Sequence, residues 1–166
     1  MKGPAILAAL LTAMPLAAQA ETFRAFLSGY EEVPSVSTQA SGTFEAVSAG
    51  DWLSIEYVLT YSNLQATIQQ AHIHFAQSGV NGPIVIWLCG TATNPGPAGT
   101  QTCTQSGTVR GTISGANVLA SPSTQQLPAG AIGQIISALK AGAAYVNIHT
   151  AASPGGEVRG QVFETN

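Results

Sequence analysis

The amino-acid sequence predicts an all-β protein, an antiparallel Greek-key β-sandwich or flattened barrel of about eight strands with one short helix. Three observations favour this class. Short segments alternate apolar and polar residues with a period of two, which is typical of half-buried strands. Clusters of glycine, proline, asparagine and serine separate these segments and indicate turns. One further segment has the 3.6-residue period of an amphipathic helix.

The clearest strand covers residues 52–61, where apolar and aromatic residues stand at every second position and therefore share one face. These residues are Leu53, Ile55, Tyr57, Leu59 and Tyr61. In chain order, the other predicted strands are 22–28, 42–48, 68–75, 84–89, 106–113, 143–149 and 157–164. We expect the core to contain Leu53, Ile55, Leu59, Ile73, Val146, Ile148, Val158 and Val162.

The single predicted helix covers residues 129–141. Its apolar residues fall at i, i+3, i+4 and i+7 and form one face; they are Ile132, Ile135, Ile136 and Leu139. Pro128 precedes the helix, and Lys140 stands in its last turn, where a cation interacts favourably with the helix dipole. Gly142 follows and can adopt the left-handed conformation that ends a helix.

The first 20 residues have the features of a secretory signal peptide. Lys2 is followed by an apolar run over residues 5–18 and by the small-residue cleavage motif Ala18-Gln19-Ala20. We therefore expect cleavage near Ala20, a secreted or periplasmic protein, and one domain over residues 21–166. No later segment has about 18 consecutive apolar residues, so we expect no transmembrane segment in the mature chain.

The chain carries few charges, which limits its partners. Only 8% of its residues are Asp, Glu, Lys or Arg, and the net charge is −3. About 25% is usual in soluble domains, and a nucleic-acid-binding protein needs a basic patch that neutralises phosphates. The composition therefore excludes nucleic acid as a partner.

Cys89 and Cys103 are the only cysteines. In an oxidising compartment they predict a disulfide. Closing a loop of about 15 residues would stabilise the fold by about 3 kcal/mol. The alternative is a pair of thiolate metal ligands, but the spacing is longer than that of a Cys-x-x-Cys site and favours the disulfide.

The three histidines lie in two predicted strands. His72 and His74 are two residues apart, so their side chains point to one side of the strand, and Ile73 points to the other. His149 lies on the side opposite to the apolar pair Val146 and Ile148. All three histidines therefore lie on faces directed away from the core, where we expect contact with solvent.

The same alternation places four more polar residues on such faces. They are Tyr145, Asn147, Glu157 and Arg159. We consider them as residues that could contact and orient the histidines of a metal site without binding the metal themselves. For Glu157 and Arg159 the alternative is an exposed ion pair, which contributes only about 0–1 kcal/mol.

A His-x-His pair with a third strand histidine is a common way to hold copper or zinc, because imidazole suits both metals. We expect a surface metal site made of His72, His74 and His149, with copper favoured, and with water, Glu157 or Glu31 completing the shell. Its affinity should fall as the pH drops through about 6.5, the usual histidine value. The alternatives are histidines that only support the framework and surface histidines without a role.

Four segments of the sequence resemble the CHRD (chordin) domain family. They are Ser28-Gly29-Tyr30-Glu31-Glu32-Val33-Pro34, Ala71-His72-Ile73-His74, Tyr145-Val146-Asn147-Ile148-His149-Thr150 and Gly155-Gly156-Glu157-Val158-Arg159-Gly160. The resemblance covers about residues 22–164. It implies an extracytoplasmic β-sandwich. In animals the domain recurs in chordin, a secreted antagonist of bone morphogenetic proteins, and bacterial members are usually exported single-domain proteins.

A more distant resemblance is to the sandwich of copper/zinc superoxide dismutase. His72, His74 and His149 would match three copper ligands, and Arg159 follows a Gly-Gly turn as in that family, although not at a clean equivalent position. Between Phe75 and Val146 there is no His, Asp or Glu, so the bridging histidine and the zinc ligands have no counterpart. The resemblance thus allows copper on three imidazoles and excludes a zinc site of that kind.

Two function classes follow. The first is an exported copper-binding protein; the second is a non-catalytic extracellular protein-interaction module without metal, whose partner is an unknown extracytoplasmic protein. We predict no catalytic residues, because no serine lies in a nucleophile motif and no glycine-rich loop precedes a helix. Glu31 and Glu32 are adjacent on an extended chain and point opposite ways, so they do not form a glycosidase pair.

Overall fold

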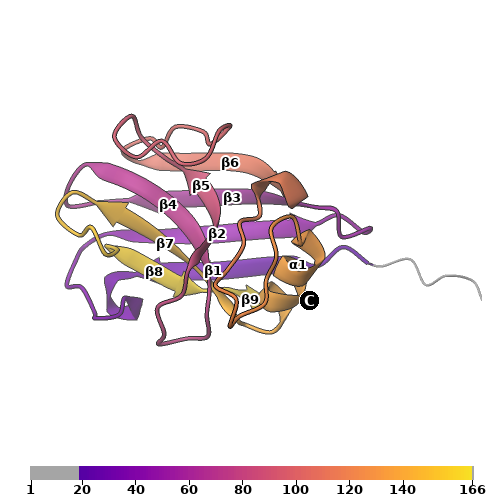
Figure 1. Cartoon of the computed structure of the whole chain (residues 1–166). Coiled ribbons are helices and arrows are strands. Elements are labelled where there is room, and N and C mark those ends of the chain that lie inside the picture. The colour runs from indigo at the N-terminus through magenta and orange to yellow at the C-terminus, as the bar shows by residue number, and fades with distance from the viewer. Residues whose placement is uncertain (1–18, 166) are drawn as a thin grey trace, which may run out of the picture.

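A computed structural model describes residues 19–165 (Figure 1). The predicted signal peptide lies outside these residues, except for Gln19 and Ala20, and stays a prediction. The elements in chain order are β1 (Thr22–Ser28), η1 (Gly29–Glu31), β2 (Ser41–Ser48), β3 (Ser54–Ser62), β4 (Ile68–Phe75), β5 (Ile84–Cys89), β6 (Gly107–Ser114), η2 (Gly115–Asn117), α1 (Ile132–Lys140), β7 (Ala144–Thr150), β8 (Val158–Gln161) and β9 (Phe163–Glu164).

The strands form one antiparallel sheet in the order β5-β4-β7-β8-β1-β2-β3-β6, and β9 pairs with β1. Figure 1 shows this sheet curling over itself, so that β4 and β7 cross the β1–β2–β3 layer. Buried residues from both layers form one apolar cluster between them. The predicted all-β class, in its flattened-barrel form with one helix, is confirmed.

The end strands of this order, β5 and β6, form no ladder with each other among residues 19–165. Two links hold this side of the barrel. The predicted disulfide joins Cys89 to Cys103 and is confirmed. The Tyr57 hydroxyl on β3 donates a hydrogen bond of 2.8 Å to the Leu88 carbonyl oxygen on β5.

The predicted core is right except at its first member. Seven of the expected residues are buried: Ile55, Leu59, Ile73, Val146, Ile148, Val158 and Val162. Leu53, in contrast, is 64% exposed. The strand begins at Ser54, and Trp52 has a φ of 58°, so a tight turn replaces the regular alternation at residues 51–53.

The final predicted strand, 157–164, divides into β8 and β9. Val162 lies between them, is fully buried, and donates its N–H to the Ala144 carbonyl oxygen at 2.9 Å. β8 lies between β7 and β1 and pairs with both, whereas β9 pairs with β1.

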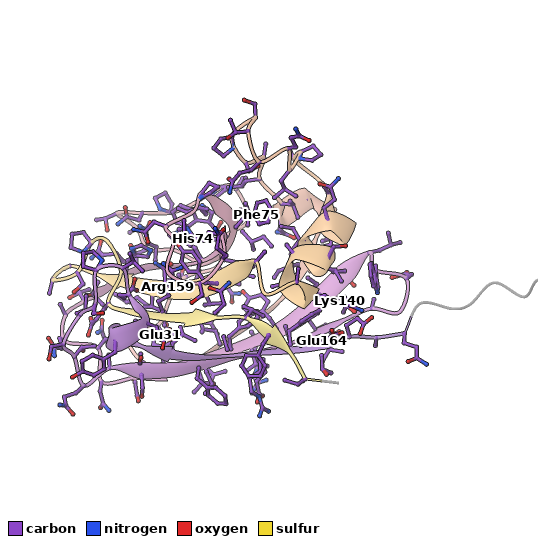
Figure 2. The ribbon with its side chains drawn as sticks, turned by 90° about the horizontal axis from the view of Figure 1, so that it is seen from below. Glu31, His74, Phe75, Lys140, Arg159 and Glu164 are labelled. Atoms are coloured by element: carbon purple, nitrogen blue, oxygen red, sulfur yellow. A yellow bond between two sulfur atoms is a disulfide. The ribbon has the colours of Figure 1, made fainter. Side chains whose placement is uncertain are left out.

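The helix begins at Ile132, three residues later than predicted, and its apolar face packs into the core at one end of the sheet (Figure 1). The Lys140 ammonium donates to the Glu21 carboxylate and lies 3.4 Å from that of Glu164, and Figure 2 shows Lys140 and Glu164 at this end. Gly142 has the predicted left-handed conformation, with a φ of 64°. Among residues 19–165 no helix has the length and hydropathy needed to cross a membrane.

Candidate metal centre

The three histidines come from two neighbouring strands. β4 and β7 pair with His72 opposite Asn147, Gln70 opposite His149 and His74 opposite Tyr145. Directly paired residues of antiparallel strands point to the same side of the sheet, so all of these side chains share one face. The pairing therefore brings the rings of His72, His74 and His149 together.

This face is buried, contrary to the predicted surface site. His72 is 0% exposed, and His74 and His149 are each 7% exposed. The Trp87 ring on β5 meets the His72 ring edge-on at 4.3 Å between centroids, and the Tyr145 ring stacks on His74 at 4.7 Å and 3°. The strand alternation correctly separated the histidines from the main core, but the second face is covered by aromatic rings and loops rather than by water.

The ligand nitrogens of the three rings lie within 4.8 Å of one another. The closest pair is Nδ1 of His72 and Nε2 of His149, which are 3.3 Å apart. Two nitrogens bound tetrahedrally at 2.0–2.1 Å to one metal ion lie about 3.3–3.4 Å apart. This pair therefore already has the spacing of two ligands of one ion. We call the group of His72, His74 and His149 the histidine trident.

Backbone carbonyls orient two of the rings. Nδ1 of His74 lies 2.8 Å from the Gly82 carbonyl oxygen, and Nδ1 of His149 lies 2.9 Å from that of Pro154. A carbonyl can only accept, so both Nδ1 atoms carry the proton and both Nε2 atoms keep a lone pair. This arrangement is typical of metal-binding histidines.

Two buried ring nitrogens have no hydrogen-bond partner among residues 19–165: Nε2 of His72 and Nε2 of His74. An unpaired buried polar atom costs about 1–3 kcal/mol. A metal ion bound by the Nε2 lone pair of His74 would remove this cost at that atom. The donor set and the unpaired nitrogen therefore fit a bound metal.

Burial keeps the rings neutral. It lowers the pKa of His72 to about 2, with smaller contributions from His149 and His74. Burial also lowers the pKa of His74 to about 4, opposed by the hydrogen bond to Gly82, and it lowers the pKa of His149. Because metal binding requires neutral imidazole, the trident is ready to bind at and well below neutral pH. The decline in affinity expected near pH 6.5 is thereby displaced to more acidic values.

The family model of the CHRD domain matches residues 23–162. The chain belongs to the CHRD domain family. The matched region contains all three histidines and both cysteines, so the trident and the disulfide are parts of the CHRD domain itself. No curated protein matches the chain significantly.

Arg159 lies close to the trident of this CHRD domain, and Figure 2 shows it in the same part of the fold as His74. It is 2% exposed, and its guanidinium carbon lies 3.4 Å from the centroid of the Tyr145 ring. Nη1 donates to Oδ1 of Asn81 at 3.0 Å, and Nη2 donates to the Val80 carbonyl oxygen at 2.8 Å. Arg159 thus tethers the 76–83 loop above Tyr145.

Asn147 and Tyr145, which the sequence placed beside the histidines, both contact them. The side-chain amide of Asn147 lies 3.0 Å from Nε2 of His149. The Tyr145 hydroxyl accepts a hydrogen bond of 3.3 Å from the Gly82 N–H, and the carbonyl of the same Gly82 binds His74. Gly82 is therefore held by His74 and Tyr145 and links the loop to the site.

Neither proposed carboxylate ligand belongs to the trident. Glu157 is buried, and its carboxylate accepts hydrogen bonds from the Thr38 hydroxyl, the Gln65 N–H and the Thr150 hydroxyl. Glu31 is exposed in η1. The described part of the chain has no Glu157–Arg159 salt bridge either. Glu157 ties loops to the sheet instead.

Sequence reasoning missed two residues next to the site, Glu32 and Trp87. Glu32 is 6% exposed and lies against Gly156, where an added Cβ would be 2.4 Å from its Oε1. Burial raises the pKa of Glu32 to about 7, opposed by the Arg159 charge and the Val33 N–H. The one sequence feature that could have indicated Glu32 is the Gly155-Gly156 pair near Arg159, because a glycine can stand where a neighbouring side chain leaves no room for a Cβ atom.

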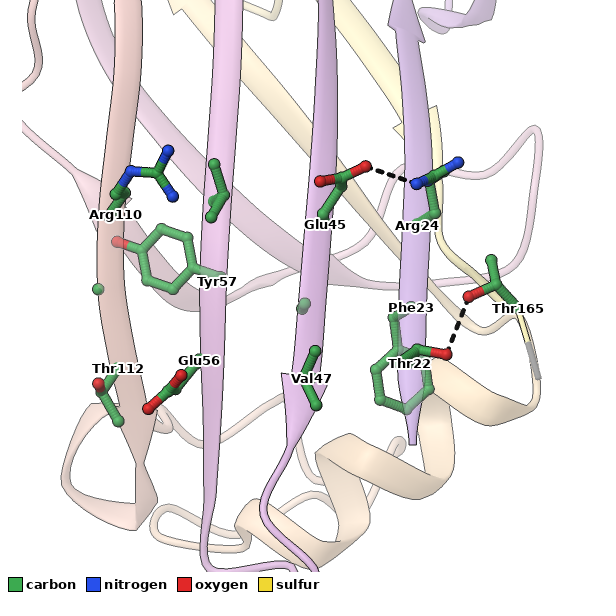
Figure 3. A pocket seen from close by; sticks show the side chains of 13 residues that line it. Thr22, Phe23, Arg24, Glu45, Val47, Glu56, Tyr57, Arg110, Thr112 and Thr165 are labelled. Carbon is green, nitrogen blue, oxygen red and sulfur yellow. Dashed lines mark hydrogen bonds and ion pairs between the residues drawn. The ribbon is translucent and has the colours of Figure 1, made fainter. Parts of the chain in front are cut away.

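Another hollow lies on the outer face of β1, β2, β3 and β6. It measures about 630 Å³, and Figure 3 shows its lining side chains standing on four adjacent strands. The Arg24–Glu45 ion pair, 2.6 Å long, crosses two of them, and Arg110 stands on a third. None of its lining residues is a histidine. This hollow and the trident are therefore separate sites.

Proposed function

We propose that this CHRD domain is an exported metal-binding protein that holds copper in the histidine trident. One observation carries the proposal: three buried, neutral imidazoles converge from two adjacent strands, and two of them are oriented by backbone carbonyls. Export is supported by the signal-peptide pattern of residues 1–20. The protein would store, buffer or deliver copper outside the cytoplasm, and we propose no catalytic step.

The choice of copper is supported by coordination chemistry. A given nitrogen site binds Cu(II) more tightly than Zn(II) in the usual order of divalent metals. The trident has no carboxylate and no thiolate among its members, and structural zinc sites usually have four protein ligands. Three imidazoles without a fourth protein ligand thus favour copper over structural zinc.

The second candidate is a protein-interaction module. It is favoured by exposed apolar residues on the outer strands, where Phe26 is 60%, Val47 is 45% and Phe163 is 42% exposed. Phe26 and Phe163 lie 6.0 Å apart between ring centroids. In this function the trident would only support the framework.

The deciding experiment is calorimetric titration of the mature, untagged protein with Cu(II) and with Zn(II). We expect one equivalent of copper to bind, and His74→Ala and His149→Ala each to weaken binding by at least about 100-fold, because removal of an outer-shell partner alone often costs 10–100-fold. Thr108→Ala, on the exposed edge of the outer sheet, serves as the matched control and should bind like the wild type. Equal and weak binding by all four proteins would leave the interaction module as the better function.

A further inference from the structure

We propose that the histidine trident selects the cuprous over the cupric ion, because the buried cation of Arg159 opposes the second positive charge. This inference rests on the proposed copper site and specifies its preferred charge state. It follows from three features of the described residues: the charge of the donor set, the position of Arg159, and the closure of the pocket.

The donor set supplies no negative charge. Its three members are imidazoles, and no Asp or Glu of residues 19–165 belongs to the group. A divalent ion would therefore bring its full charge into a pocket whose ligands are at most 7% exposed. Burying uncompensated charge is costly, and the cost rises steeply with the charge. A monovalent ion meets a much smaller penalty at the same nitrogens.

Arg159 adds a fixed positive charge beside this pocket. Its guanidinium lies 3.4 Å from the Tyr145 ring centroid, and that ring stacks on His74 at 4.7 Å. Both of its hydrogen-bond acceptors, Asn81 and the Val80 carbonyl, are neutral. The field of Arg159 reaches the trident, because the Tyr145 ring contacts both the guanidinium and the His74 ring. The same field disfavours each positive charge that a metal brings.

Two carboxyl groups face this region and act in the opposite direction. Glu32 lies near Arg159, but burial raises its pKa to about 7, so near neutral pH it is only partly ionised. Glu157 is satisfied by hydrogen bonds from Thr38, Gln65 and Thr150, and it does not belong to the trident. Neither group fully cancels the charge of Arg159 at the trident.

The aromatic rings that enclose the trident also favour Cu(I), as the charge of Arg159 does. Cu(II) prefers tetragonal sites with four or more nitrogen and oxygen ligands. Trp87 covers His72 edge-on, and Tyr145 covers His74 face-on. Three imidazoles between these rings suit an ion that accepts a low coordination number, and Cu(I) is such an ion.

The size of the Arg159 effect follows from Coulomb's law. The two stacking distances put the guanidinium carbon at most about 8 Å from the centroid of the His74 ring. With an effective dielectric constant of about 20, one additional unit charge at this distance changes a binding ratio about thirty-fold. For a one-electron couple this change equals about 90 mV.

The test is the reduction potential of the bound copper, measured by mediated titration while the Cu(II) EPR signal is followed. Cuprous affinity is measured separately by anaerobic competition with the chelator bicinchoninate. We expect a potential above that of the aqueous couple, and Arg159→Gln to lower it by about 90 mV. Arg110→Gln removes the same charge from the outer sheet face and should leave the potential unchanged.

Glu32→Gln provides an independent reading that does not disturb the contacts of Arg159. At about pH 8.5, where Glu32 is ionised, this variant removes a negative charge and should raise the potential. The inference is overturned if the wild type binds Cu(II) more tightly than Cu(I), or if Arg159→Gln and Glu32→Gln both leave the potential unchanged. If copper binding does not depend on the histidines at all, the proposed function fails as well, so the two failures are distinguishable.

Discussion

At the scale of single residues, the histidines show how burial prepares a ligand. His74 and His149 each give their Nδ1 proton to a backbone carbonyl, and burial lowers the pKa values of all three rings. The neutral tautomer that a metal requires is thus present before any metal arrives. The fold loses stability in acid, because the unfolded chain binds protons at these histidines more readily than the buried rings do.

This dependence on pH predicts an acid-labile apoprotein. A histidine whose folded pKa is lowered stabilises the fold fully above its unfolded value of about 6.5, and this contribution is lost as the pH falls toward the folded value. For His74, with a folded pKa of about 4, the loss amounts to about 3 kcal/mol. Urea unfolding between about pH 7 and pH 4 should show this decline.

The His74→Gln variant serves as the control for that measurement, because its side chain cannot titrate. Its free energy of unfolding should depend less steeply on pH over the same range. Identical slopes in the two proteins would contradict the assignment of a lowered pKa to His74.

The contribution of Glu32 to stability depends on pH in the opposite direction. Its folded pKa is raised to about 7, so the contribution to stability is present below about 4.5 and is lost as the pH rises through 7. Glu32→Gln should therefore stabilise the protein at about pH 8 by roughly 1–3 kcal/mol and change little near pH 4. Thermal unfolding at both pH values checks this; greater stability of the wild type at pH 8 would show that the attraction of the Arg159 charge outweighs burial.

At the scale of elements, the 76–83 loop positions the trident. Gly82 binds both His74 and Tyr145, and Arg159 holds Val80 and Asn81. An added Cβ at Gly82 would lie 2.2 Å from the Phe75 carbonyl oxygen. The loop can approach β4 this closely only because residue 82 has no side chain.

Gly82→Ala should therefore displace the loop from β4 and release the His74 ring. We expect copper affinity to fall by about 10–100-fold, as for loss of an outer-shell partner. Gly133→Ala is the matched control, because no atom lies within 4 Å of its added Cβ, and it should raise stability by about 0.5–1 kcal/mol as a helix substitution. Unchanged copper affinity in Gly82→Ala would mean that the loop does not orient His74.

At the scale of the whole molecule, the barrel is open between β5 and β6, and the Cys89–Cys103 bridge crosses this side. The apolar core lies between the two layers, whereas the trident lies on the other face of β4 and β7. β7 is buried along its whole length because it separates the apolar core from the polar site. The fold thus has two buried regions of different character.

Removal of the bridge should loosen the β5 side first. The paired substitution Cys89→Ala and Cys103→Ala should cost about 3 kcal/mol, from the added freedom of a loop of about 15 residues in the unfolded chain. Thermal unfolding of this variant and of the oxidised wild type gives the difference. A melting temperature within error of the wild type would show that the bridge contributes no stability.

The sequence by itself determined where the strands and the helix lie and which side of each strand a side chain occupies. Alternation in β3, β4 and β7 depends only on local backbone geometry, which is why Ile55, Ile73 and Val146 could be assigned to the core and the histidines to the opposite side. The CHRD motifs and the cysteine pair are likewise local patterns. The assignment of Leu53 to the core was wrong because the positive φ of Trp52 interrupts the alternation. The apolar–polar pattern of the sequence gives no sign of this turn.

Only the tertiary structure decided what lies on the second face. The pairing of β4 with β7 brings together His72 and His149, which are 77 positions apart. The carbonyls of Gly82 and Pro154 select the tautomers of His74 and His149. Trp87, Arg159 and Glu32 reach the site from three other segments. Strand alternation states which way a side chain points, but whether it meets water or protein depends on how distant segments pack, and that packing turned an expected surface site into a buried one.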